Sequence, residues 1–264
     1  MADFTAKDVQ TLRRATGAGM LDSKRALEAT GGDMDKAKTW LREQGLAGAA
    51  KRSDREATQG AVALAVSGRN ASIVELRCET DFVAKAETFV NLTDELAQLV
   101  AEKGEQATAD RTEDIDELKT TLKENISVGQ VVRFEMGEDS VVGTYLHMQS
   151  GRGVNAVLVE MRGGGEELAH DVAVHVAFAR PSYLRREDVP KEEVEAERAV
   201  VENLSRNEGK PEAAVPKIVD GRMNGWFKER CLLEQSYAKD EKRTIADLVG
   251  SAEIVRFAQV VVGG

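Results

Sequence analysis

Apolar residues at helical spacing open the chain and predict three short helices. Thr5 and Asp8 have the spacing of a capping box, and a first helix follows them. Gly17-Ala-Gly19 interrupts this helix, and Met20 to Ala29 has the pattern of a second one. Asp33 can cap a third helix, because its carboxylate can accept bonds from free amides of the first turn. The apolar residues of the third helix are Met34, Ala37, Trp40 and Leu41.

The third helix is expected to end at Gly45, since glycine is the commonest residue just past a helix end. Small and polar residues fill the next stretch, Gly48 to Gln59, which is typical of a linker. We therefore predict a separate three-helix domain over residues 1–53, with a linker to about residue 59.

The rest of the chain contains an internal similarity between two copies of different length. The segment Gly60 to Arg77 resembles Gly143 to Arg162, and Val132-Arg-Phe134 resembles Val255-Arg-Phe257. In each copy, short β-branched runs and an amphipathic stretch give the order strand, strand, helix, strand. The predicted fold class is α+β, with two repeated core subdomains over residues 60–140 and 141–264.

A charged stretch, residues 188–228, has no counterpart in the first copy and interrupts the second. Pro190 suits a first helical turn, and a thin apolar stripe follows it. Asn207 to Pro211 turns the chain, and a second helical pattern returns. We predict a projecting antiparallel helical hairpin, kinked at Pro216, which is suited to contacts with partners.

Composition and charge narrow the function classes. The 264 residues are 42% hydrophobic and only 5% aromatic, so base-stacking surfaces are not expected. Residues 1–53 hold ten Lys or Arg and seven Asp or Glu, a net charge of +3, whereas the total is −10. The remaining residues therefore carry −13, which argues against wholesale phosphate binding. No apolar run approaches the roughly 20 residues of a membrane span, so the expected location is the cytoplasm, with no membrane partner.

Residues that could carry chemistry are sparse. His147, His170 and His175 are the only histidines, and the last two miss the helical spacing of a zinc pair. Gly151-x-Gly153 joins two predicted strands and fits a hairpin loop, and Gly163-Gly-Gly165 fits a flexible turn. We expect no catalytic site, no bound metal and no cofactor. Cys78 and Cys231 lie far apart, and buried free thiols are expected.

One corner between a predicted strand and a predicted helix has two interpretations. In the first, Thr80 or Asp81 caps the helix, and Phe82 and Val83 pack on the sheet. In the second, an exposed Phe beside an Asp forms a compact probe for a partner. Spacing alone favours the first interpretation.

The sequence resembles the bacterial translation elongation factor Ts family. The resemblance rests on Cys-Glu-Thr-Asp-Phe-Val-Ala-Lys at 78–85, on Leu12-Arg-x-x-Thr-Gly-Ala-Gly-Met20 and on Lys24-x-Ala-Leu27. Further matching segments are Asn155 to Val159, Gly221-Arg-Met223 and Val255-Arg-Phe257.

This resemblance implies a ubiquitin-associated-like three-helix head, a two-subdomain core and a helical hairpin arm. It also implies a guanine-nucleotide exchange factor, not an enzyme, which binds elongation factor Tu in its GDP state. Direct nucleic-acid binding is not implied. The arm mediates self-association in some family members, so self-association through residues 188–228 is an expectation here.

The resemblance also implies the contact residues. Asp81 and Phe82, in the motif Thr80 to Val83, are expected near the magnesium and phosphate site of the GTPase and would displace magnesium. His147 is an expected contact of the core. The expected contacts of the head with the nucleotide-binding domain are Arg13, Met20, Leu21 and Lys24. One departure is Lys123 in Leu122-Lys-Glu-Asn125, where the family is expected to have Gly.

Two other functions remain open on the residues alone. The mildly basic head could be a helix-turn-helix module of a nucleic-acid-binding regulator, which would bind duplex DNA with a steep salt dependence. Alternatively, an enzyme site could lie between the two repeats, and its activity would then depend on His147 or His175.

Overall fold

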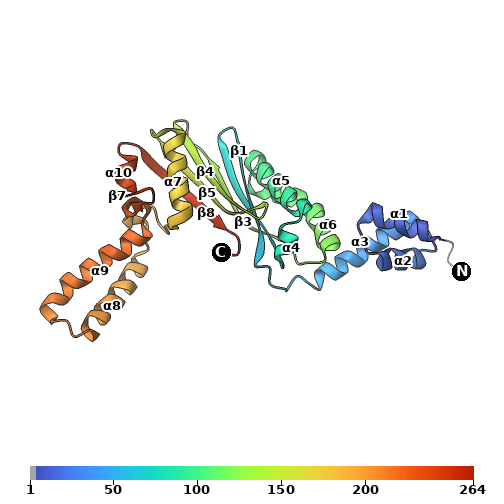
Figure 1. Ribbon diagram of the computed structural model, residues 1–264, viewed down its shortest axis with the longest axis horizontal. Helices are drawn as coiled ribbons and strands as arrows, with labels where there is room; N and C mark the ends of the chain where they lie inside the picture. The colour runs from blue at the N-terminus through green and yellow to red at the C-terminus, as the bar shows by residue number, and fades with distance from the viewer. Residues whose placement is uncertain (1–3) are drawn as a thin grey trace. The chain divides into compact units, whose positions relative to one another are not determined.

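The computed structural model describes residues 4–264, which divide into two compact units (Figure 1). The first unit contains the described residues up to Arg133, together with His147–Asn155 and Val260–Gly264. The second unit contains Phe134–Leu146 and Ala156–Gln259. Helices come first, and two sheets with their covering helices follow, so the fold is α+β.

Three helices open the described chain: α1 (Ala6–Thr16), α2 (Met20–Ala29) and α3 (Met34–Ala50). Thr5 and Asp8 form the predicted capping box, and Gly17 ends α1 in the left-handed conformation that glycine tolerates. Asp33 caps α3 as predicted. A small core joins the helices, formed mainly by Val9, Leu12, Ala26, Leu27, Ala37 and Leu41.

The predicted end of the third helix is wrong. Helix α3 continues through Gly45 to Ala50, so the first residues of the expected linker are helical. Glycine is often found just past a helix end, but here it lies inside the helix, where a Cβ atom would meet Thr120.

The first sheet has the strand order β1-β2-β3, formed by β1 (Gln59–Ser67), β2 (Asn70–Cys78) and β3 (Ser127–Glu135). Strands β1 and β2 pair antiparallel. Between β2 and β3 lie α4 (Asp81–Ala84), α5 (Glu87–Lys103), a short 3₁₀ segment η1 (Glu105–Arg111) and α6 (Thr112–Leu122). Helix α5 packs on the sheet through an apolar face that includes Phe89, Leu92, Leu96 and Val100.

The second sheet has the order β4-β5-β8, formed by β4 (Ser140–Gln149), β5 (Arg152–Arg162) and β8 (Glu253–Val261). Helix α7 (Gly165–Ala179) shares its core with β5 through Val172, Val176, Val157 and Val159. The two-stranded pair β6 (Ser236–Tyr237) and β7 (Asp240–Thr244), with α10 (Ile245–Val249), precedes β8. The predicted order strand, strand, helix, strand therefore occurs in both halves, with extra elements before each last strand.

The same buried carboxylate recurs in the two sheets. Glu75 of β2 is fully buried, where it pairs with Arg77 and accepts bonds from backbone amides at Gln130 and Gly263. Glu160 of β5 is 3% exposed and accepts bonds from the Gly137 amide and from Arg256. Each glutamate therefore ties its strand to a distant part of the chain.

Two packed helices lie between α7 and β6: α8 (Lys191–Asn207) and α9 (Val215–Arg230). They run antiparallel as a hairpin, as predicted (Figure 1). Short 3₁₀ segments flank them: η2 (Arg186–Asp188), η3 (Glu212–Ala214) and η4 (Leu232–Glu234). The expected kink at Pro216 is wrong, because this proline occupies the first turn of α9, where its missing N–H has no intrahelical partner to lose.

No helix in the part of the chain from residue 4 onward has both the length and the apolar character needed to cross a membrane.

Candidate functional site

The corner after strand β2 combines a buried half with an exposed half. Thr80 is the N-cap of the one-turn helix α4, and its hydroxyl accepts a bond from the Val83 amide at 3.4 Å. Val83 packs against the first core and Ala84 is buried, whereas Phe82 is 82% exposed. The cap-and-core interpretation therefore holds for Thr80 and Val83, and Phe82 has the exposure expected of a probe.

A carboxylate from the loop after α6 braces this corner. Glu124 accepts bonds from the amides of Glu79 and Thr80, both at 3.0 Å, and from the Thr80 hydroxyl at 2.5 Å. The Asn125 amide donates to the Glu79 carboxylate at 2.7 Å in return. The sequence analysis named the loop that contains Glu124 but missed its bonds to the corner, because the partners lie 44 and 45 residues earlier in the chain.

Asp81 presents a negative charge beside Phe82. Its carboxylate lies 2.5 Å from Nζ of Lys85, one helical turn later. The hydrogen bond from Lys85 is the main cause that lowers the pKa of Asp81 below its ordinary value. The corner therefore offers an apolar ring and an ionised carboxylate side by side at neutral pH.

The four head residues named from the sequence surround the turn from α1 to α2. Met20 and Leu21 start α2 and are 46% and 58% exposed, so two large apolar side chains face solvent next to each other in the chain. Arg13, in the last turn of α1, is exposed, and Lys24 lies 3.5 Å from Glu28 on the outer face of α2. These side chains form an exposed surface with apolar and basic character.

The three histidines occupy different environments. His147 lies near the end of β4 and is exposed. His170 contacts the carbonyl of Thr144 at 2.8 Å. His175 is buried and bonded to Gln235 and to the Ala238 amide, and burial lowers the pKa of its imidazole.

The remaining sequence motifs have structural roles. Gly151 lies in the β4–β5 turn with a positive φ, and Gly163 and Gly165 shape the turn into α7, as predicted. Cys78 and Cys231 are buried free thiols, also as predicted. Within residues 4–264, no cluster of three His, Cys, Asp or Glu side chains could hold a metal ion.

The sequence matches known proteins over its whole length. The family model described as Elongation factor TS matches residues 79–264. Elongation factor Ts of Clavibacter michiganensis subsp. michiganensis is 46% identical over 277 residues, which cover all of both chains. Elongation factor Ts of Kineococcus radiotolerans is 44% identical over 266 residues and 96% of each chain, and that of Streptomyces avermitilis is 43% identical over 280 residues and all of both chains. The chain therefore belongs to the elongation factor Ts family, the nucleotide exchange factors of elongation factor Tu, and it is not an enzyme.

Proposed function

We propose that the corner Thr80 to Val83 promotes exchange by entering the GDP-bound GTPase near its magnesium and phosphate site. The observation that carries this proposal is the 82% exposure of Phe82 beside the ionised carboxylate of Asp81. Phe82 supplies apolar contact area, and Asp81 supplies a charge that competes with the ligands of the magnesium ion. Displacement of magnesium then weakens the binding of GDP to the GTPase. GDP leaves, and GTP can bind in place of GDP during elongation in the cytoplasm.

The bracing of the corner supports this role. Thr80 caps α4, Val83 anchors it in the core, and Glu124 fixes the backbone between strand and helix. A probe held in its binding conformation loses little entropy when it binds. Thr80 and Val83 therefore act as supports, and Asp81 and Phe82 act as contacts.

The head and the core supply further contacts in this proposal. The exposed surface of Arg13, Met20, Leu21 and Lys24 binds the nucleotide-binding domain of elongation factor Tu. Exposed His147 contributes a separate contact. Apolar anchors surrounded by charged groups are typical of protein interfaces.

Thermodynamic linkage explains how such contacts release a nucleotide. If a partner lowers the affinity of the GTPase for GDP by some factor, GDP lowers the affinity of the GTPase for that partner by the same factor. A coupling of about 4 kcal/mol corresponds to roughly a thousandfold change in affinity. The protein thus changes the rates of exchange, and the nucleotide concentrations set its direction.

The finer architecture follows the same family pattern. We infer that α1 to α3 form a ubiquitin-associated-like head and that the two sheets are copies of one α+β unit. Support for the second inference comes from the common strand order and from the matched buried residues Glu75 and Glu160.

Self-association through the α8–α9 hairpin stays a prediction. Val200 and Leu204 are exposed large apolar residues one turn apart on α8, and they would form the contact between two copies. Sedimentation velocity on wild type and on Leu204→Glu tests it. A wild-type dimer that the substitution dissociates is expected, and a wild-type monomer at high concentration would refute the prediction.

The test of the exchange mechanism is stopped-flow release of a fluorescent GDP analogue from magnesium-loaded elongation factor Tu. We expect Asp81→Ala and Phe82→Ala to slow release while circular dichroism and urea unfolding stay close to wild type. Phe178→Ala is the matched control, because Phe178 is a phenylalanine with 78% exposure at a different place, in α7. Equal losses for Phe82→Ala and Phe178→Ala, or unfolding of the corner variants, would refute the proposed site.

A further inference from the structure

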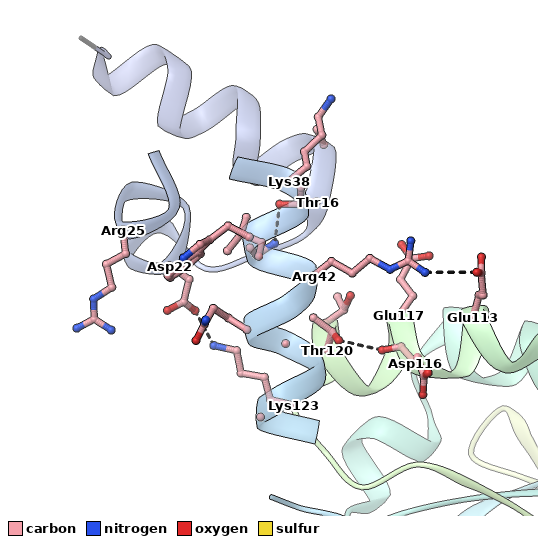
Figure 2. Close-up of a pocket in the computed structure, with 18 of the residues that line it drawn as sticks. Thr16, Asp22, Arg25, Lys38, Arg42, Glu113, Asp116, Glu117, Thr120 and Lys123 are labelled. Atoms are coloured by element: carbon pink, nitrogen blue, oxygen red, sulfur yellow. Dashed lines mark hydrogen bonds and ion pairs between the residues drawn. The ribbon is translucent and has the colours of Figure 1, made fainter. Parts of the chain in front are cut away.

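Helices α3 and α6 cross closely within the first unit (Figure 2). At the crossing, a Cβ atom on Gly45 would lie 2.1 Å from Cγ2 of Thr120 and 3.0 Å from its Cβ. A side chain at position 45 would therefore have to displace Thr120, and a large side chain has no room there unless the helices separate. Glycine inside a helix is less favourable than alanine, and this crossing supplies a physical reason for the glycine.

An ion pair joins the loop after α6 to the start of α2. Nζ of Lys123 lies 2.8 Å from Oδ2 of Asp22. Lys123 is also the C-cap of α6, in the left-handed conformation at φ 59°. This conformation explains why glycine is expected here, and a lysine side chain adds the reach to Asp22 that glycine lacks.

Two further polar contacts join helix α3 and the residues that follow it to helix α6. Arg42 of α3 lies 3.4 Å from the carboxylate of Glu113, and Nη2 of Arg52 donates to the carbonyl of Lys119 at 3.1 Å. The second contact gives a hydrogen-bond donor to a carbonyl in the last turn of α6. The positive charge of the arginine also interacts favourably with the negative end of the helix dipole. We call this whole set of contacts the α3–α6 seam: Asp22, Arg42, Gly45 and Arg52 on one side, and Glu113, Lys119, Thr120 and Lys123 on the other.

The α3–α6 seam is a moderate attachment and not a packed core. It surrounds a cavity of about 570 Å³ whose lining carries charged side chains of both signs (Figure 2). Exposed ion pairs contribute little to stability, because water and salt screen them. A single substitution in the seam can therefore loosen it while the core of each side stays intact.

The seam links the two contact surfaces of the proposed function through neighbouring residues. Leu21 precedes Asp22, which is paired with Lys123. Lys123 in turn precedes Glu124, which is bonded to Thr80 at the corner. A short chain of contacts thus runs from the exposed apolar residues of α2 to the corner that carries Phe82.

We propose that the α3–α6 seam fixes the spacing between the surface at Met20 and Leu21 and the corner at Asp81 and Phe82, so that both bind one GTPase together. Asp22, Gly45 and Lys123 are positioning residues, since they act through these surfaces. The inference rests on the proposed function, because it takes both surfaces as contacts.

Fixed spacing affects affinity more than the rate of release in the bound complex. Once one surface binds, the other is already at a high effective concentration beside its own site. If the α3–α6 seam is loosened, the head must be fixed relative to the corner each time the protein binds. The entropy lost in fixing it lowers the affinity for the GTPase. The corner itself is unchanged, so the rate of GDP release at saturation stays the same.

The test uses the full chain with the substitution Gly45→Leu. Leucine is a strong helix former, so α3 itself is not weakened. The matched control is Gly225→Leu in α9, where the space around the glycine is open. We expect the concentration for half-maximal GDP release to rise about tenfold, equivalent to about 1.4 kcal/mol, with the plateau rate within about twofold of wild type.

A second pair of variants keeps the proposal testable if Gly45→Leu folds poorly. Asp22→Lys should raise the half-maximal concentration, and adding Lys123→Asp should restore it, since aspartate tolerates the left-handed conformation better than most residues. Fluorescence distances between dyes on introduced cysteines at Lys36 and Glu102 report the docking of the head directly. We expect both loosened variants to broaden this distance distribution.

The outcomes separate this proposal from the proposed function. A broadened distance with an unchanged half-maximal concentration would overturn the positioning role, and so would an unchanged distance in both loosened variants. Failure of the charge swap to restore affinity would also overturn it. If wild type does not accelerate GDP release, or if Phe82→Ala does not slow it, the proposed function fails, and the distance measurement still reports whether the seam holds the head.

Discussion

Removal of the Glu124 carboxylate tests whether the corner must be held rigid. Glu124 accepts three hydrogen bonds from Glu79 and Thr80, and no other side chain fixes these two amides in the described part of the chain. Hydrogen bonds to a charged group contribute about 1.5–3 kcal/mol each when buried, and this carboxylate is only half-buried. We therefore expect Glu124→Ala to destabilise the fixed corner by about 2–3 kcal/mol in total.

The loss should appear in nucleotide exchange. If the binding-competent corner becomes the minor form, the apparent affinity for the GTPase falls by the same fraction. Since every 1.4 kcal/mol is a factor of ten, the second-order rate constant of GDP release should drop roughly tenfold to a hundredfold. Stopped-flow fluorescence with excess GTPase measures this constant, and Glu241→Ala on β7 serves as an exposed control.

The variant Glu124→Gln separates bracing from charge. Its amide oxygen can take the place of the oxygen that accepts from both backbone amides, and its NH2 group can donate to the Thr80 hydroxyl. We expect exchange within about threefold of wild type, because the geometry survives. Equal losses in Glu124→Gln and Glu124→Ala would refute the bracing argument and assign the effect to the charge of Glu124.

Further predictions concern buried groups. Burial of Glu160 opposes its ionisation, but bonds from the Gly137 amide and Arg256 outweigh this and keep its pKa below the ordinary 4.5. A lowered pKa stabilises the fold above about pH 4.5 and loses that effect as pH falls through the folded value, so urea unfolding of Glu160→Gln should show a shallower acid slope than wild type. Burial raises the pKa of Cys78 to about 12 and that of Cys231 to about 11, so neither thiol should react with a thiol reagent at pH 8 before unfolding; rapid labelling of the native protein would contradict this.

Local signals were sufficient for most of the secondary structure. The capping box at Thr5, the cap at Asp33 and the left-handed Gly17 depend on residues within one turn, and all three are present. The internal similarity predicted the order strand, strand, helix, strand along each half of the chain, and that order is present in both halves. Spacing indicated Thr80 or Asp81 as a cap, and Thr80 is the cap; it also favoured a buried Phe82, and the exposed ring contradicts that preference.

Features that depend on distant residues could not be predicted from local patterns. Gly45 has the local properties of a helix stop, but its partner Thr120 lies on α6, far along the chain. Glu124 lies in the segment Leu122 to Asn125 that was compared with the family, but the segment does not indicate its partner, and only the folded chain brings it to Thr80. Both contacts join residues that lie far apart in the sequence, so the periodicity of local segments could not indicate them.

Lys123 shows how a departure from a family pattern can be interpreted physically. As a sequence feature, a lysine in place of an expected glycine indicates an altered loop. The backbone at φ 59° does place a non-glycine residue in the left-handed region, which costs roughly 1–2 kcal/mol. The same residue gains a pair with Asp22 that glycine cannot make. The strain is confined to the backbone of Lys123, whereas the ion pair joins two distant parts of the chain. Lysine at this position therefore lowers the stability of the loop and adds an attachment between the head and the corner.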